Sequence, residues 1–277
     1  MPMTEKKMVS EKNLKIAKVL VILSASLILV LATAGFGRAA VLCIPVSTSR
    51  GLLTAAAVNQ SSGTIDGTSC DIGDYIMLSR SVSSLTVHDA NQYGIFVDSS
   101  LGSITVSISG ATVYNIGAHT GNEFTPNGVQ TGIGIIYDSG PSGPTAYGNI
   151  TSSDVHAYQK GGIEANHNSN VTTTSNNVTG LGPVDYIAQN GIEYARDAAG
   201  IIRGNTVSDN FYTGSTGVFA DGSNCGGLNP PCPPGRQYVS CGILLVLVDP
   251  NHIQRGQNDV SNGNQRNYAV VTDNAFD

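Results

Sequence analysis

A 29-residue spacing between recurring short motifs constrains the fold of this chain most strongly. Gly-Ile-Glu occurs at Gly162-Ile163-Glu164 and again at Gly191-Ile192-Glu193. An Asn-x-Val element occurs at Asn176-Asn177-Val178 and at Asn205-Thr206-Val207, with the same spacing. Two unrelated motifs that keep one spacing indicate a structural repeat. A repeat of this length, with short apolar/polar alternations and Gly/Asn turns, is typical of a solenoid.

Further copies of both motifs extend the repeat in both directions. Gly-Ile elements recur at Gly94-Ile95-Phe96, Gly132-Ile133-Gly134 and Gly242-Ile243-Leu244, with a degenerate copy at Ala269-Val270-Val271. Copies of the Asn-x-Val motif occur at Ala111-Thr112-Val113, Ser153-Asp154-Val155 and Asn258-Asp259-Val260. The alternation has period 2, so Ile95 and Val97 share one face of a strand and Phe96 lies on the other. We therefore predict an all-β fold of stacked parallel strands, with Asn side chains at equivalent turns forming an internal ladder.

The first 40 residues differ from the rest. Five lysines within residues 1–18 precede a mostly apolar, uncharged run from Val19 to Gly37. This pattern predicts a signal peptide or a membrane anchor over residues 1–40 and a β-helix domain over residues 41–277. The domain is expected to be secreted or held at the cell surface, with membrane contact only through the N-terminal segment.

The charge of the expected exported part limits its partners. Beyond residue 40 eight basic residues face eighteen acidic ones, a net charge of −10, and Lys160 is the only lysine. Nucleic acid is not expected as a partner, because phosphate binding depends on Lys and Arg. The composition is compatible with a glycan and with a divalent cation such as Ca²⁺, and no other cofactor is expected.

Five cysteines agree with export. Cys43 and Cys70 bracket the start of the solenoid, and Cys225 and Cys232 close a Gly/Pro-rich loop. Two disulfides, Cys43–Cys70 and Cys225–Cys232, are predicted, with Cys241 as a buried free thiol; other pairings remain open.

The repeats differ mainly in the connection between the Asn-marked strand and the next Gly-Ile strand. These connections span Gly117–Gln130, Ala157–Gly161, Gly180–Asn190 and Phe211–Cys241. Solenoids gather insertions on one side, and that side is often the binding face. The loops around the binding face are therefore expected on one side of the molecule.

Several stretches resemble a bacterial family of exported right-handed parallel β-helix repeat proteins. They are Cys70-Asp71-Ile72-Gly73, Asn91-Gln92-Tyr93-Gly94, Tyr158-Gln159-Lys160-Gly161-Gly162-Ile163 and the run from Gly180 to Ile192, GLGPVDYIAQNGI. The resemblance implies a pectate-lyase-like right-handed β-helix, a fold that carries polysaccharide lyases, hydrolases and epimerases as well as adhesins. The sequence lacks the polygalacturonase Asn-Thr-Asp, Asp-Asp and Gly-His-Gly patterns and the pectate lyase Arg-x-Pro-x-x-Arg, so the resemblance supplies no chemistry.

Glu164 and Glu193 occupy one outward position on adjacent coils, about 4.8 Å apart along the stack. Two carboxylates at that spacing repel by about 3 kcal/mol at an effective dielectric constant of 20. The pair is therefore predicted to raise one pKa, bind a cation or recruit a base such as Lys160 or Arg196. The alternative is a solvated face on which the two side chains splay apart.

The remaining candidate residues lie in the long connections. Lys160, with Glu164 and Glu193, is a candidate catalytic residue, and substrate contacts are predicted from His119, Tyr158, Asp185, Tyr186 and Arg196. Three classes of function remain: an enzyme of the polysaccharide lyase or glycoside hydrolase type, a glycan-binding module, and a structural or adhesive surface protein. We expect an exported β-helix that binds or processes cell-envelope or environmental polysaccharide, with catalysis left open.

Overall fold

The computed structural model describes residues 41–213, 240–258, 260 and 262–271. The predicted signal or anchor segment 1–40 lies outside the described residues, as do Cys225 and Cys232. Among the residues that are described, no helix has the length and apolar character needed to cross a membrane.

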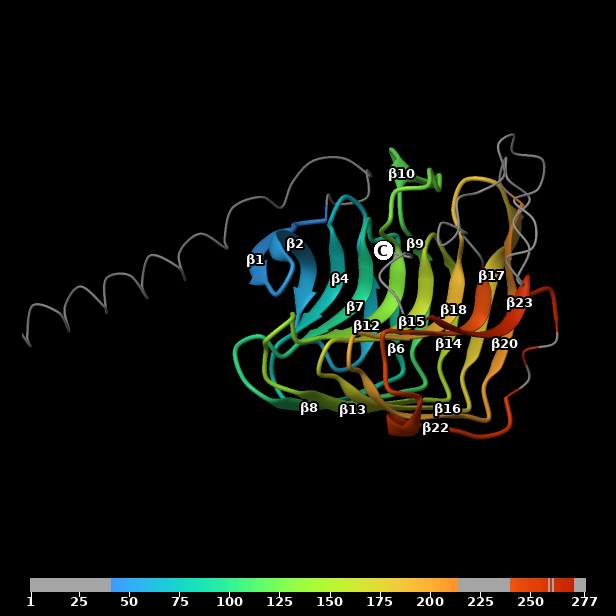
Figure 1. Ribbon diagram of the computed structural model, residues 1–277. Helices are drawn as coiled ribbons and strands as arrows, with labels where there is room; N and C mark the ends of the chain where they lie inside the picture. Colours follow the sequence, from blue (N-terminus) through green and yellow to red (C-terminus); the bar gives the residue numbers. More distant parts are fainter. Residues whose placement is uncertain (1–40, 214–239, 259, 261, 272–277) are drawn as a thin grey trace, which may run out of the picture. The chain divides into compact units, whose positions relative to one another are not determined.

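Three large sheets make up the described part of the chain, which contains no α-helix (Figure 1). Sheet 1 consists, in spatial order, of β1 (Ile44–Thr48), β2 (Gly51–Val58), β4 (Ile72–Ile76), β7 (Tyr93–Asp98), β12 (Ile133–Asp138), β15 (Gly161–Asn166), β18 (Asn190–Ala195), β21 (Cys241–Val246) and β23 (Arg266–Val271). Sheet 2 consists of β5 (Arg80–Ser83), β8 (Ile104–Ser109), β13 (Ala146–Thr151), β16 (Asn170–Thr174), β19 (Ala199–Arg203) and β22 (Ile253–Arg255). Sheet 3 consists of β3 (Gly63–Asp66), β6 (Leu85–His88), β9 (Thr112–Ile116), β14 (Asp154–Tyr158), β17 (Asn177–Val184) and β20 (Thr206–Tyr212).

The complete coils, from β4 to β20, pass through the three sheets in the same order. β15 in sheet 1 is followed by β16 in sheet 2, by β17 in sheet 3 and then by β18, which pairs with β15. Pairing between coils is parallel. In the described residues, antiparallel pairing is confined to β1–β2 and to a small hairpin of β10 (His119–Thr120) and β11 (Glu123–Phe124). The parallel sheets confirm the prediction of a β-solenoid.

The strand register places the repeated motifs on equivalent rungs. Ile163 pairs with Ile192, and Glu164 pairs with Glu193. Both isoleucines are buried in one continuous core, together with Ile95 on an earlier coil. The predicted inward position is therefore confirmed for Ile95, Ile163 and Ile192. It is wrong for Ile133, which belongs to an apolar cluster outside the solenoid.

The glycine before each inward isoleucine has a packing cause. A Cβ atom on Gly162 would overlap Cγ1 of Val178 and would lie 2.6 Å from the carbonyl oxygen of Gly191 on the next coil. Gly191 is blocked in the same way by Val207 and by the carbonyl oxygen of Gly242. Each of these valines belongs to the Asn-x-Val motif of the same coil. The two motifs keep one spacing because they contact each other inside the solenoid.

The asparagine of the second motif forms the predicted internal ladder. Asn176 Oδ1 accepts a hydrogen bond from the Ser153 N–H on the preceding coil, at 3.0 Å. The Asn176 Nδ2 group and the Asn176 N–H both donate to Oδ1 of Asn205, each at 3.0 Å. Asn205 repeats this pattern with Asn258 on the following coil. The ladder satisfies backbone groups at the buried turn from sheet 2 to sheet 3.

Buried glutamines hold the opposite corner, where sheet 3 returns to sheet 1. Gln159 accepts two backbone N–H groups and donates to two carbonyl oxygens of the loop that precedes β12. Gln189 donates to the carbonyl oxygens of Tyr158 and Gln159 on the preceding coil. The connections Gly117–Gln130 and Gly180–Asn190 meet these glutamines at this corner, as predicted. Most of the predicted connection Phe211–Cys241 lies outside the described residues.

The register corrects the alignment of two motif copies. In β12 the glycine of the repeat is Gly134, not Gly132, because Gly134 makes the same close contact with a valine of its own coil. Near the C-terminus Tyr268 pairs with Ile243, so Ala269 lies one residue beyond the inward position. Both errors arose because apolar and glycine residues repeat at two-residue intervals in these strands.

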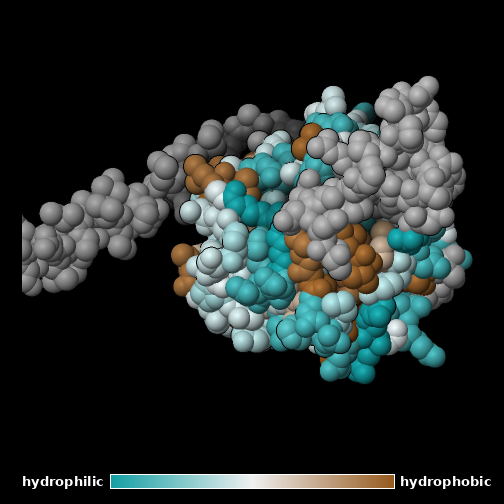
Figure 2. Space-filling view, in the orientation of Figure 1, coloured by the Kyte–Doolittle hydropathy of each residue, from teal (hydrophilic) through white to brown (hydrophobic). Residues whose placement is uncertain are grey.

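The N-terminal hairpin of β1 and β2 forms the first edge of sheet 1, and its tip reaches over the outer face of the sheet. The Cys43–Cys70 disulfide ties the start of β1 to the first coil, which confirms that prediction. Side chains of the hairpin pack on an apolar cluster outside the solenoid. The cluster contains Ala55, Ile72, Tyr75, Tyr93, Phe96, Ile133 and Ile136, with Val46 and Leu53 against it. Figure 2 shows apolar and hydrophilic areas side by side on the face turned toward the viewer.

Candidate functional site

The outer face of sheet 1 carries a polar band between two apolar clusters. The band is centred on Glu164 in β15 and Glu193 in β18, which are partners in the parallel register. On one side lies the cluster beneath the hairpin. On the other side lies a second cluster of Ala195, Cys241, Leu244, Val246 and Ala269. The predicted outward position of both glutamates on adjacent coils is confirmed.

Arg50, at the tip of the N-terminal hairpin, reaches into this band. Its Nη2 lies 3.2 Å from Oε1 of Glu164, and its Nε lies 2.6 Å from Oδ2 of Asp138 on the neighbouring strand. Nη1 donates to the Tyr93 hydroxyl at 3.2 Å. The Arg50 side chain is 28% exposed, whereas that of Asp138 is 1% exposed. The guanidinium therefore joins the hairpin to three strands of sheet 1 and neutralises buried carboxylates.

The environment of the band shifts the pKa values of two of its carboxyl groups in opposite directions. Burial raises the pKa of Glu164 to about 7, with Arg50 opposing the rise and the charges of Glu193 and Asp138 adding to it. Burial also acts to raise the pKa of Asp138. There the hydrogen bonds from His167 and Arg50 prevail and lower the pKa to about 2. Two nearby carboxyl groups with separated pKa values suit the roles of proton donor and fixed anion.

Lys160 and Glu193 flank the second apolar cluster. Lys160 Nζ donates to the carbonyl oxygen of Ala188 at 3.3 Å, and Asn190 Nδ2 donates to Oε2 of Glu193 at 2.9 Å. Burial raises the pKa of Cys241 to about 12; Glu193 adds to the rise, and Arg266 and Lys160 oppose it. Lys160 contacts the connection that leads into β18, the strand that carries Glu193. The base that contacts Glu164 is Arg50, rather than the expected Lys160 or Arg196.

Tyr158 does not line a binding face. Its side chain is fully buried, and its hydroxyl bonds to Oδ1 of Asn210 at 2.6 Å inside the solenoid. The prediction that Tyr158 contacts substrate is therefore wrong. The residue ends a sheet 3 strand with its ring turned inward, so it fills the core beside the next corner.

The other predicted contact residues are spread over separate parts of the molecule. Arg196 Nη1 lies 3.4 Å from Oδ1 of Asn166, just beyond the glutamate pair. Asp185 is exposed and Tyr186 is half-buried in the connection from β17 to β18. His119 instead faces Asp89, which follows β6 of sheet 3, with Nε2 3.7 Å from Oδ1. His119 therefore contributes to a different cluster from Glu164.

Sequence reasoning missed three residues of the band. Arg50 lies outside the repeat, so no periodicity could pair it with Glu164. Asp138 ends β12 at the position where Asp98 ends the neighbouring strand β7. This repeated aspartate was a signal in the sequence that could have identified Asp138. His167 directly follows β15, outside both repeated motifs, and its Nδ1 lies 2.7 Å from Oδ1 of Asp138.

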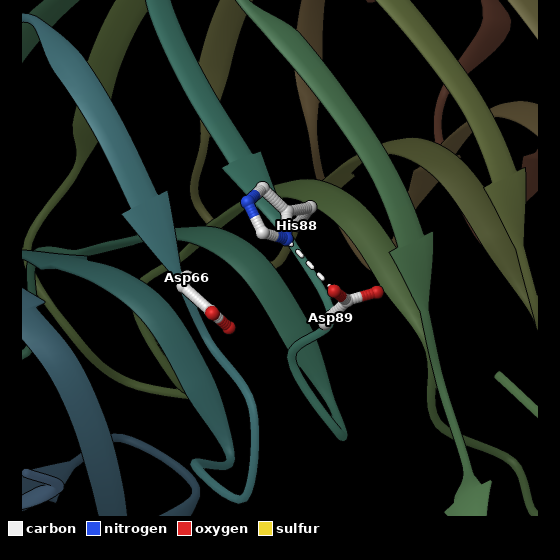
Figure 3. Close-up of side chains that lie close together, drawn as sticks. All are labelled: Asp66, His88 and Asp89. Carbon is white, nitrogen blue, oxygen red and sulfur yellow. Dashed lines mark hydrogen bonds and ion pairs between the residues drawn. The ribbon is translucent and has the colours of Figure 1, made fainter. Parts of the chain in front are cut away.

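A second set of side chains, on sheet 3, has the composition of a metal site. Asp66, His88 and Asp89 each offer one ligand atom, and these atoms lie within 4.8 Å of one another. Figure 3 shows them at the ends of two neighbouring strands, with the His88–Asp89 hydrogen bond dashed. These are residues that could hold a cation.

Sheet 2 carries a shallow polar hollow on its outer face. It has a volume of about 420 Å³, and its lining includes Asn170, Thr172, His252 and Gln254. The hollow has hydrogen-bonding groups from these four side chains and lies on a different sheet from the glutamate pair.

No family model, no curated protein and no solved structure matches this chain.

Proposed function

We propose that the outer face of sheet 1 binds a polysaccharide at the Glu164–Glu193 pair. The observation that carries this proposal is the environment of the pair: two carboxylates on adjacent rungs, with Arg50 beside one and the Asn190 amide beside the other. Sugar hydroxyls donate to carboxylates and accept from guanidinium and amide groups. The pair presents both kinds of partner within one short stretch of the sheet.

The apolar cluster next to the pair supports a sugar polymer rather than a small ion as the ligand. Leu244 and Ala269 follow Glu193 in the same row along the sheet. Sugar rings bury C–H surface as well as hydroxyls when they bind. A polymer that runs along the row would meet acidic residues first and apolar residues next.

We further infer that the solenoid is right-handed and works outside the cytoplasm. Crossovers between parallel strands of one sheet are right-handed in nearly all proteins. The Cys43–Cys70 disulfide supports an oxidising compartment. The basic and apolar composition of residues 1–40 supports export by a signal peptide or an anchor.

Glycoside hydrolysis is a second candidate function for the same pair. Glu164 titrates near neutral pH and Glu193 lies on the adjacent rung. A carboxyl group with a raised pKa suits a general acid, and a neighbouring carboxylate suits a nucleophile or a base. On this mechanism Glu164 protonates the glycosidic oxygen, and Glu193 stabilises the positive charge that develops on the sugar.

A glycan array with the purified protein tests the binding proposal. The variants are Glu164→Gln and Glu193→Gln, and the control is Glu123→Gln, which removes an exposed glutamate of β11. We expect one class of polysaccharide to bind the wild type and the control, and each site variant to bind at least tenfold more weakly. If the double variant Glu164→Gln, Glu193→Gln binds the polysaccharide as tightly as the wild type, the glutamate pair is not the binding site.

Release of reducing ends from the bound polysaccharide then separates the two candidate functions. Hydrolysis by the wild type that Glu164→Gln abolishes would establish the enzyme. Binding without hydrolysis leaves a glycan-binding module. The absence of any glycan ligand would favour a structural or adhesive surface protein.

A further inference from the structure

Three metal-ligating side chains meet on the outer side of sheet 3. Asp66 ends β3 and His88 ends β6, and the two residues are partners in the parallel register. Asp89 follows His88 directly in a left-handed backbone conformation, with φ of 61°. This turn brings the Asp89 carboxylate back to the His88 ring, where Oδ2 lies 2.8 Å from Nδ1 (Figure 3). Two rungs of the solenoid therefore supply three ligands without a long loop.

A fourth residue, His119 on β10, is aimed at the same place. Its side chain is 5% exposed, and its Nε2 lies 3.7 Å from Oδ1 of Asp89. Its Nδ1 lies 2.8 Å from the Gly117 carbonyl oxygen. A carbonyl oxygen only accepts, so Nδ1 donates to it and Nε2 is the ring nitrogen that faces Asp89.

The Nε2 atom of His119 is buried and lacks a hydrogen-bond partner among the described residues. A buried polar atom without a partner is unfavourable. A cation between Nε2 and the Asp89 carboxylate would supply that partner. A carbonyl that fixes the tautomer of a metal-bound histidine is the usual arrangement around such ions.

Neighbouring residues hold the carboxylates in place. Thr68 donates to Oδ1 of Asp66 through its N–H and its hydroxyl, at 3.0 and 2.6 Å. Asn115 Nδ2 donates to Oδ1 of Asp89 at 3.1 Å. The Tyr114 ring stacks on His88, with centroids 5.2 Å apart. The cluster is thus oriented by contacts of the kind that surround metal ligands.

We propose that Asp66, His88, Asp89 and His119 bind one divalent transition-metal ion of the Zn²⁺ type. Two imidazoles and two carboxylates form a mixed nitrogen and oxygen set, which Zn²⁺ accepts and Ca²⁺ does not favour. The two negative charges match the charge of the ion. Zinc–ligand bonds of about 2.0–2.2 Å require the four ligand atoms to move closer together than they lie in this structure. The ion joins the β10–β11 hairpin to sheet 3.

Zinc binding to the untagged full chain, stripped with a chelator, tests this proposal by isothermal titration calorimetry. We expect one Zn²⁺ per chain with micromolar or tighter affinity, and no comparable binding of Ca²⁺. His88→Gln and Asp66→Asn should each weaken Zn²⁺ binding at least tenfold. His156→Gln is the matched control, because His156 stacks on the other side of Tyr114 and lies outside the cluster.

A second measurement keeps the test independent of folding. Zn²⁺ should raise the melting temperature of the wild type and of His156→Gln, and should leave that of His88→Gln unchanged. Retained β-type circular dichroism in each variant shows that the loss is local. A wild type that binds no zinc would overturn the proposal, and so would equal weakening by His156→Gln. Unchanged affinity in His119→Gln would overturn the four-ligand assignment.

Discussion

At the scale of single residues, the fold is specified by contacts that repeat once per coil. Gly191 leaves room for Val207, and Asn176 links the turns of two coils. Neither residue acts through a general propensity, since glycine and asparagine both disfavour regular strands. Their positions are instead dictated by neighbours on the same coil and on the next one.

Adding one methyl group to the repeat glycine should destabilise the protein. In Gly191→Ala the new Cβ would overlap Cγ1 of Val207, and overpacking of this kind costs about 1–3 kcal/mol. The matched control is Gly102→Ala, whose Cβ would meet nothing within 4 Å. Denaturant unfolding should show a loss of stability for the first and a change within about 0.5 kcal/mol for the second. Equal effects would refute the packing explanation of the motif.

Adjacent asparagines give a similarly direct test of the ladder. Asn176→Ala leaves the Ser153 N–H and the Ile150 carbonyl oxygen without their buried partner, so the free energy of unfolding should fall by about 2–4 kcal/mol. Asn177 is exposed, and its side-chain amide donates to the carboxylate of Asp154 at the surface. Asn177→Ala should change stability by less than about 0.5 kcal/mol. If chemical denaturation gives the two variants the same midpoint, the asparagine ladder does not stabilise the protein as claimed.

At the scale of elements, the N-terminal hairpin decides what the outer face of sheet 1 offers. Arg50 at its tip bonds to Asp138 and Glu164, and its turn N–H at Ser49 bonds to Asp98. The hairpin therefore does more than cap the first coil. It covers the start of the sheet and leaves the glutamate pair at the edge of the covered area.

Loss of the Cys43–Cys70 disulfide should destabilise the protein and loosen the N-terminal hairpin. The bridge closes a segment with a sequence separation of 27, which corresponds to about 3 kcal/mol of chain entropy. A Cys43→Ser, Cys70→Ser variant should lose stability of that order, and amides of β1 and β2 should exchange faster with deuterium. Unchanged protection of the hairpin in hydrogen exchange would show that Arg50 and the apolar contacts suffice.

At the scale of the whole molecule, the sequence could predict the solenoid but only part of the site. Periodicity predicted the register of Glu164 with Glu193, because every coil repeats one geometry. It could not place Arg50 or His119, whose segments lie outside the repeat. The inward turn of Tyr158 was missed because a strand end does not reveal whether its last side chain faces the core.

The pH dependence of stability reports the buried glutamate. A folded-state pKa of about 7, above the ordinary 4.5, means that the native protein binds this proton more tightly than the unfolded chain does. The resulting stabilisation is complete below about pH 4.5 and is lost as the pH rises through 7. Glu164→Gln should therefore gain about 1–3 kcal/mol relative to wild type between pH 4.5 and pH 8. A relative stability that stays flat over this range would contradict the burial of an ionisable Glu164.

The ionisation of Glu164 is the central claim about the site, and carboxyl-carbon NMR measures it directly. The chain has five glutamates, of which Glu123, Glu164 and Glu193 lie beyond residue 40. Glu123→Gln and Glu164→Gln identify their signals by disappearance. We expect the Glu164 signal to titrate with a midpoint near pH 7. If the signal that vanishes in Glu164→Gln instead titrates between pH 4 and 5, like an ordinary exposed glutamate, the account of the site is contradicted.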